Sequence, residues 1–165
     1  MNIKRIVKHL LTTRGMVKRV FPRSTLIMIE KAIKASETAH VGEIRFAVEG
    51  ALDGVPLFKD QSARERAIEL FSQLRVWDTQ HNNGLLIYLL LADRAVEIVA
   101  DRGIHEKVSS QDWHRICQQM ETAFRQSNYE SGVVSGVQAV TQYLVQHFPA
   151  GGQNGNELPD KPVVL

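Results

Sequence analysis

Polar and apolar residues alternate over residues 43–49, which have the sequence EIRFAVE. A period of two is typical of a β-strand that buries one of its faces. Ile44, Phe46 and Val48 would form the buried face of this strand. Gly42 separates the strand from a helical pattern before it, since glycine is favoured where a helix ends.

Residues 85–91 contain only Leu, Ile and Tyr. Such a continuous apolar run is typical of a central strand that is buried on both faces. Residues 92–94 then separate this run from another strand pattern at residues 95–100. Because this connection is short, the two strands are predicted to form an antiparallel hairpin.

Apolar residues spaced three and four positions apart predict four amphipathic helices, at residues 24–39, 62–74, 110–125 and 129–148. The second of these helices connects the first two strands, so those strands are predicted to be parallel with a right-handed crossover. The order of elements therefore predicts an α/β fold. We expect a three-layer α/β/α sandwich with a small mixed sheet, a parallel crossover plus an antiparallel hairpin, flanked by helices.

The length of 165 residues is typical of a single domain. We expect residues 1–23 to form a basic N-terminal arm or helix, and residues 24–148 to form the α/β domain. Residues 149–165 are rich in Gly, Asn and Pro, which predicts a disordered C-terminal tail.

Positive charge is concentrated in the arm, although the formal net charge of the chain is only +2. The cationic residues that precede the first acidic residue, Glu30, are Lys4, Arg5, Lys8, Arg14, Lys18, Arg19 and Arg23. The small net charge does not indicate a specific nucleic-acid partner. The arm is expected either to pack on its own domain as a helix or to contact a partner or an anionic membrane surface.

The arm does not have the continuous apolar segment of a signal peptide, because basic residues interrupt it. No apolar run reaches the roughly 18 residues that are needed to cross a bilayer. We therefore expect a cytoplasmic protein, which the basic arm could also hold at the inner face of the membrane.

The predicted topology gathers carboxylate and amide side chains at one edge of the sheet. Glu43 begins the first strand, Asn82 and Asn83 precede the second, and Asp78 lies in the loop that leads to it. Asp101 follows the third strand, which runs in the opposite direction, so it is expected at the same edge. Carboxylate and amide oxygens are the ligands that Ca²⁺ and Mg²⁺ prefer. These residues are therefore a candidate metal site.

Glu37, near the end of the preceding helix, could extend this acidic edge. The alternative interpretation is that the Asn-Asn-Gly and Asp-Arg-Gly sequences are ordinary turns, in which Asn, Asp and Gly are common without any ligand. The sequence leaves both interpretations open.

Four segments resemble motifs of the TPM domain family and occur in the family's order. They are residues 37–45 (ETAHVGEIR), residues 78–88 (DTQHNNGLLIY), residues 96–104 (VEIVADRGI) followed by Trp113, and residues 128–132 (NYESG). Together they cover roughly residues 24–148. The family is named after plant thylakoid proteins and a nematode receptor modulator, and its fold is a mixed sheet between helices.

This resemblance implies a divalent-cation and protein-binding module, since some members of the family bind Ca²⁺. Mg²⁺ is the less favoured cation. The motif positions that carry over are Glu43, Asn83 and Asp101. The chain shows no signal peptide or C-terminal membrane segment, and in this it resembles the short cytosolic bacterial subgroup.

Two alternative functions remain. A plant member of the family is associated with acid phosphatase activity, so a metal-assisted phosphatase is one, with Glu43 and Asp101 holding the ion. The other is a structural or interaction protein at the membrane surface, docked by the basic arm. Cys117 lies on an apolar helical face and is expected to be a core thiol. Trp77 is expected to pack in the core, with lining of a cleft as the alternative.

Overall fold

A four-stranded sheet forms the centre of the computed structural model, which describes residues 2–151 and 155–165. The strands are β1 (Glu43–Glu49), β2 (Gly84–Leu90), β3 (Ala95–Ala100) and β4 (Val163–Val164), in the spatial order β3-β2-β1-β4. β1 is parallel to β2, and β2 forms an antiparallel hairpin with β3. The predicted crossover and hairpin are therefore confirmed.

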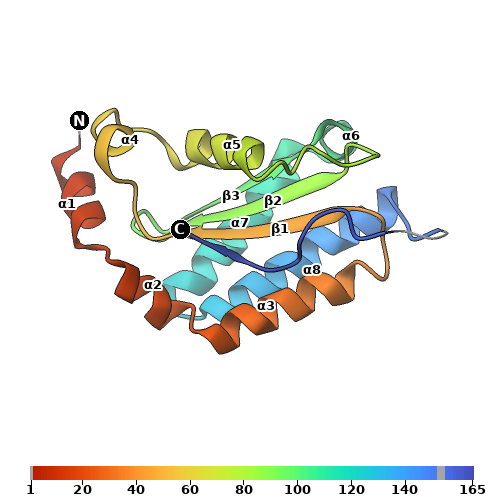
Figure 1. The fold of residues 1–165 in the computed structure, drawn as a ribbon, viewed down its shortest axis with the longest axis horizontal. Coiled ribbons are helices and arrows are strands. Elements are labelled where there is room, and N and C mark those ends of the chain that lie inside the picture. The colour runs from red at the N-terminus through yellow and green to blue at the C-terminus, as the bar shows by residue number, and fades with distance from the viewer. Residues whose placement is uncertain (1, 152–154) are drawn as a thin grey trace.

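Helices cover both faces of the sheet, as Figure 1 shows. One face carries α3 (Arg23–Ser36), α7 (Ser110–Arg125) and α8 (Tyr129–His147). The other face carries α5 (Ala63–Gln73), with the short helices α4 (Gly54–Phe58) and α6 (Arg102–His105) beyond its two ends. The alternation of side chains along the strands supplies each layer with its own apolar cluster. This is the predicted three-layer α/β/α arrangement.

Both faces of β1 are buried, whereas its alternating sequence predicts only one buried face. The second face includes Glu49, whose carboxylate accepts hydrogen bonds from the Arg66 guanidinium (2.9 Å) and the Tyr88 hydroxyl (2.7 Å). A buried charge is tolerated when it is paired and hydrogen-bonded in this way. The strand pattern therefore identified the apolar face correctly, but it could not show that α5 would bring a partner for the polar one.

The N-terminal arm forms two helices, α1 (Ile3–Leu11) and α2 (Arg14–Val20). His9 of α1 and Val17 of α2 are buried against the rest of the molecule. The described part of the arm therefore lies on its own domain, and Met1 is outside the described residues.

The C-terminal tail joins the sheet, although its composition predicts disorder for residues 149–165. β4 pairs in parallel with β1, and Leu158 is buried under the α5 layer. The prediction is therefore wrong for residues 155–165, while residues 152–154 lie outside the described residues. The physical reason is that the free edge of β1 offers unpaired backbone groups, which a short apolar segment can satisfy.

No helix in the described part of the chain combines the length and the apolar character that crossing a membrane requires. Even α8, with 19 residues, is amphipathic, since its buried side chains lie on the side facing the sheet and its other residues are partly or fully exposed.

Candidate functional site

Three strand ends meet at one edge of the sheet, which we call the rim and define by Glu43, Asn82, Asn83, Asp101 and Gly103. β1 and β2 begin at the rim, and β3 ends there. The backbone N–H of Asp101 donates to the Gly84 carbonyl (2.9 Å), and that of Glu43 donates to the Asn83 carbonyl (3.1 Å). The structure thus brings together residues from three distant segments of the sequence.

Glu43 is buried at the rim by the C-terminal tail. Its two carboxylate oxygens accept hydrogen bonds from the backbone N–H groups of Glu157 (3.2 Å) and Leu158 (3.1 Å). Burial raises the pKa of Glu43, although the two backbone hydrogen bonds oppose that shift and the nearby Asp160 adds to it. Both carboxylate oxygens of Glu43 are thus already hydrogen-bonded to the C-terminal tail.

Two oxygen atoms at the rim are buried and have no hydrogen-bond partner among the described residues. The side chain of Asn83 is fully buried, and its Nδ2 donates to the Val41 carbonyl (2.8 Å) while its Oδ1 has no donor. Asp101 is 7% exposed, and its Oδ1 accepts from the Arg102 N–H (2.7 Å) while its Oδ2 has no donor. Buried polar atoms are normally satisfied, so these two oxygens require an explanation.

Backbone carbonyls crowd the same edge. A Cβ at Gly103 would lie 2.7 Å from the Asn82 carbonyl oxygen and 2.8 Å from that of His81. A Cβ at Gly84 would lie only 1.9 Å from the Val76 carbonyl oxygen. Only glycine fits at these positions, and the close approach brings the carbonyl oxygens of His81 and Asn82 against Gly103, two residues after Asp101.

The two other predicted site residues lie farther toward the surface. Asp78 is exposed and forms an ion pair with Arg75 (3.2 Å). Asn82 has a positive φ of 51°, and its Oδ1 accepts a long hydrogen bond from Arg102 (3.4 Å). Trp77 is 47% exposed, so the prediction that it packs in the core is wrong. Its ring lies beside the Arg75 guanidinium, in the loop that leads to β2.

The rim matches a hard cation in the kind of donor it offers, because Asp101, Asn83 and the nearby carbonyls are all oxygen ligands. Among residues 2–151 and 155–165, however, no group of three or more His, Cys, Asp or Glu side chains is arranged to hold a metal ion. A cation at the rim would therefore depend on amide and backbone oxygens to complete its coordination.

A second group of carboxyls lies next to the rim, under the tail. Glu37 adjoins Glu43 and Asp160, and its Oε1 is buried with no hydrogen-bond partner in the described part of the chain. Burial, together with the charges of Glu43 and Asp160, raises the pKa of Glu37 to about 8. Sequence reasoning missed Asp160 because it assigned the tail to disorder. The apolar Val-Val-Leu ending after Pro162 was the signal that could have indicated a strand.

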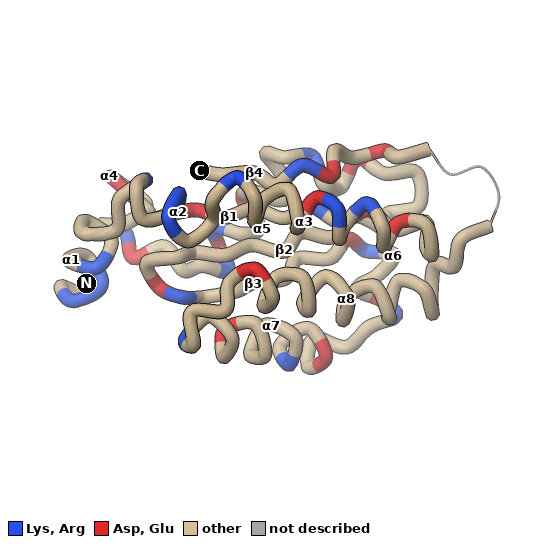
Figure 2. Tube along the Cα trace, turned by 90° about the horizontal axis from the view of Figure 1, so that it is seen from below, with Lys and Arg blue, Asp and Glu red and all other residues tan. Residues whose placement is uncertain are grey.

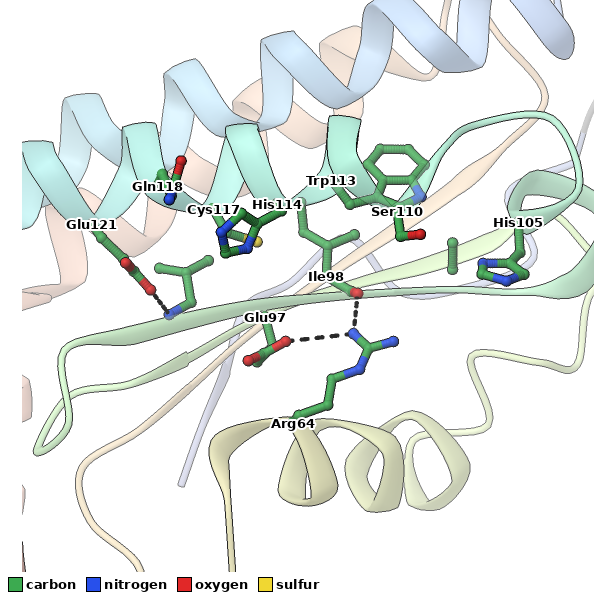
Figure 3. A pocket seen from close by; sticks show the side chains of 12 residues that line it. Arg64, Glu97, Ile98, His105, Ser110, Trp113, His114, Cys117, Gln118 and Glu121 are labelled. Atoms are coloured by element: carbon green, nitrogen blue, oxygen red, sulfur yellow. Dashed lines mark hydrogen bonds and ion pairs between the residues drawn. The ribbon is translucent and has the colours of Figure 1, made fainter.

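A pocket of about 290 Å³ lies at the outer edge of β3, between α5 and α7 (Figure 3). Arg64 reaches from α5 to the Ile98 carbonyl, and the Glu121 carboxylate accepts the Val96 N–H (3.0 Å). These side chains occupy backbone groups that would otherwise accept another strand. The same pocket contains Cys117, as expected a buried thiol, and its pKa is raised to about 12 by burial and by Glu97 and Glu121. The polar side chains of this pocket thus protect the exposed edge of β3. Cys117 is not an activated nucleophile, because its pKa is raised rather than lowered.

The comparisons with known proteins agree with this fold. Residues 18–143 match the TPM domain family. The BA42 protein from the psychrophilic bacterium Bizionia argentinensis is similar in structure, with a TM-score of 0.73 and 28% identity over 86% of this chain and 93% of that one. The N-terminal domain of a P. gingivalis protein shares the fold, with a TM-score of 0.61 and 24% identity over 78% of this chain and 81% of that one. No curated protein sequence matches the chain.

Proposed function

Because this chain belongs to the TPM domain family, we propose that it is a divalent-cation-binding module that takes Ca²⁺ at the rim and presents the ordered rim to another protein. The observation that supports this function is the pair of buried oxygens, Asn83 Oδ1 and Asp101 Oδ2, that have no donor among the described residues. A bound cation would satisfy oxygens that hydrogen bonds leave unmatched.

In this proposal Asp101 supplies the negative charge, and Asn83 together with the carbonyls near Gly103 supplies neutral oxygens. Ca²⁺ accepts six to eight oxygen ligands in flexible arrangements, whereas Mg²⁺ demands a nearly ideal octahedron. The rim offers amide and backbone oxygens on irregular loop segments, a flexible donor set that favours Ca²⁺. Bound cation would hold the loop before β2 and the start of α6 in one arrangement.

The protein-binding part of the proposal rests on Trp77. Its indole is 47% exposed and lies in the same loop as Asp78, on the approach to the rim. Tryptophan is enriched among the residues that dominate protein interfaces. A cation that orders this loop would fix the position of an aromatic anchor for a partner.

Calorimetric titration of the full chain with Ca²⁺ tests the cation site. We expect saturable heat and a rise in the melting temperature for the wild type, and an affinity lower by about tenfold or more for Asp101→Asn. Asparagine also caps a helix well, so α6 should remain folded in this variant. Asp78→Asn is the matched control, because Asp78 is exposed and paired with Arg75, and this change should leave Ca²⁺ binding intact.

The proposal fails if the wild type shows neither heat nor a thermal shift, or if both variants lose binding equally. The alternative of a metal-assisted phosphatase rests on the resemblance to the family, with the same Asp101 polarising a phosphoryl oxygen through the ion. Hydrolysis of a simple phosphate ester by the wild type that Asp101→Asn abolishes would favour the phosphatase. Hydrolysis that persists in this variant would belong to a contaminant rather than to the rim.

A further inference from the structure

α1 exposes an apolar stripe to solvent. The stripe consists of Ile3 (70% exposed), Val7 (48%), Leu10 (69%) and Leu11 (69%). Residues at spacings of three and four lie on one side of a helix, so these four side chains form a continuous surface. An amphipathic helix of a globular protein normally directs such a stripe into the core, and here it points outward.

The opposite side of α1 is fixed to the domain by polar contacts. Arg5 pairs with Asp93 (2.8 Å) and with Asp60 (2.8 Å), while His9 Nε2 lies 2.9 Å from Asp93 Oδ1. The other ring nitrogen of His9 accepts a hydrogen bond from the backbone N–H of Leu52 (2.9 Å), so Nε2 carries the hydrogen and donates a hydrogen bond to Asp93. These bonds fix the rotation of α1 about its axis, and the apolar stripe cannot turn inward without breaking them.

Cationic side chains border the stripe. Lys4 and Lys8 are exposed on α1, and Arg14, Lys18 and Arg19 are exposed on the neighbouring α2. The sequence has no acidic residue before Glu30. Figure 2 shows the resulting concentration of Lys and Arg along α1, at one end of the molecule.

A groove of about 420 Å³ continues this surface. Leu11 and Met16 contribute apolar walls, and Lys8 and Arg94 contribute positive charge. α4, which contacts α1, adds the exposed side chains of Val55 (63%) and Phe58 (60%). The end of the molecule near α1 therefore combines apolar surface with cations over several elements.

We propose that this end of the molecule docks on the surface of an anionic phospholipid bilayer. α1 lies in the plane of the interface, with the apolar stripe at the boundary of the acyl chains and with Lys4 and Lys8 beside the phosphate groups. An apolar helical face flanked by lysines is the chemistry that such a surface recognises, and each nearby cation adds attraction to the anionic headgroups. The proposal does not depend on the function of the rim, because the two sites lie at opposite ends of β2. The rim is at the start of this seven-residue strand, and Asp93, which binds Arg5 of α1, follows its other end.

Vesicle flotation of the full chain tests the proposal, with a chelator present so that no divalent cation bridges protein and lipid. We expect the protein to float with vesicles that contain phosphatidylglycerol and to remain in solution with vesicles of phosphatidylcholine alone. Replacing Leu10→Gln and Leu11→Gln together should lower the bound fraction relative to free protein by about tenfold or more, since both side chains lose apolar contact with the membrane. Added salt should also weaken binding, because it screens the lysines.

Ile68→Gln is the matched control, since Ile68 is an exposed apolar residue (50%) on α5, away from α1. Circular dichroism should show that each variant keeps its fold, which is expected because the substituted side chains are exposed. The proposal is overturned if the wild type does not float with anionic vesicles, or if the double variant floats as well as the wild type. It is equally overturned if analytical ultracentrifugation shows a wild-type dimer that the double variant abolishes, because the stripe would then cover a second copy of the chain.

Discussion

Glu37 lies between α3 and the C-terminal tail, where it adjoins two other carboxyl groups. Burial opposes its ionisation, and the charges of Glu43 and Asp160 oppose it further, so that its pKa rises from 4.5 to about 8. A protonated Glu37 can donate a hydrogen bond to Asp160, whereas an ionised Glu37 would repel it. The protonation of this one residue therefore affects how firmly the tail is held.

This raised pKa makes the stability of the fold depend on pH. Below pH 4.5 both the folded and the unfolded chain carry the proton on Glu37, and the contribution of Glu37 to stability is fully present. Between pH 4.5 and about 8 the unfolded chain releases the proton while the folded chain keeps it, so stability falls as the pH rises. The melting temperature should therefore decline across this range.

Glu37→Gln should make that decline shallower, because glutamine cannot ionise. The measurement is the melting temperature of both proteins at several pH values between 4.5 and 8. Glu30→Gln, a change at a half-buried carboxylate of the same helix, should keep the wild-type slope. Equal slopes for Glu37→Gln and the wild type would show that Glu37 titrates in its ordinary range.

At the scale of elements, α1 directs polar side chains toward the domain and its apolar stripe toward solvent, the opposite of an ordinary amphipathic helix. Its inward side carries Arg5 and His9, and both converge on Asp93 in the turn between β2 and β3. Burial raises the pKa of Asp93, but the hydrogen bonds from Arg5 and His9 outweigh that effect and hold it below its ordinary value. Asp93 thus accepts hydrogen bonds from both of these side chains, while Ile6 of α1 packs against the apolar cluster under α5.

Asp93→Ala should release α1 without unfolding the rest of the molecule. The change leaves the buried His9 ring without its acceptor and removes one of the two carboxylates that pair with Arg5, which should cost about 2 to 4 kcal/mol in local stability. Hydrogen exchange should show loss of protection in residues 3–11 and unchanged protection in β2. Asp53→Ala is the control, since Asp53 is exposed and makes no side-chain cap to α4. If α1 amides stay protected in Asp93→Ala, other contacts hold the helix.

At the scale of the whole molecule, the tail completes both the sheet and the layer above it. β4 covers the free edge of β1, and Leu158 enters the apolar cluster under α5. The backbone N–H groups of Glu157 and Leu158 satisfy Glu43, as described above. Residues at opposite ends of the domain sequence therefore depend on one another for stability.

Leu158→Ala should destabilise the fold by about 2 to 4 kcal/mol, the usual cost of removing a buried leucine side chain. The free energy of unfolding in urea measures this effect. Val164→Ala is the matched control because Val164 is 46% exposed, and it should cost much less. A loss of stability that is no greater at Leu158 than at Val164 would contradict the view that the tail is part of the core.

Much of the fold could be predicted because it depends on local patterns. The apolar run of β2, the hairpin and the helix at Ser110–Arg125 follow from side-chain periodicity, and the parallel crossover follows from the handedness of such connections. The same topology was enough to place Glu43, Asn83 and Asp101 at one edge. Strand direction alone determines which ends of the strands meet.

The remaining features depend on contacts between distant segments, which periodicity does not encode. Composition predicted a disordered tail, and only the free edge of β1 could make those residues a strand. The orientation of α1 likewise depends on distant contacts, since the bonds from Arg5 and His9 to Asp93 leave its apolar stripe facing solvent. The sequence by itself determined the elements and their order, because local sterics and side-chain alternation act within each segment. Only the tertiary structure decided which carboxylates are hydrogen-bonded, which lack a donor among the described residues, and which face of α1 is exposed to solvent. Each of these properties depends on a partner that is far away in the chain.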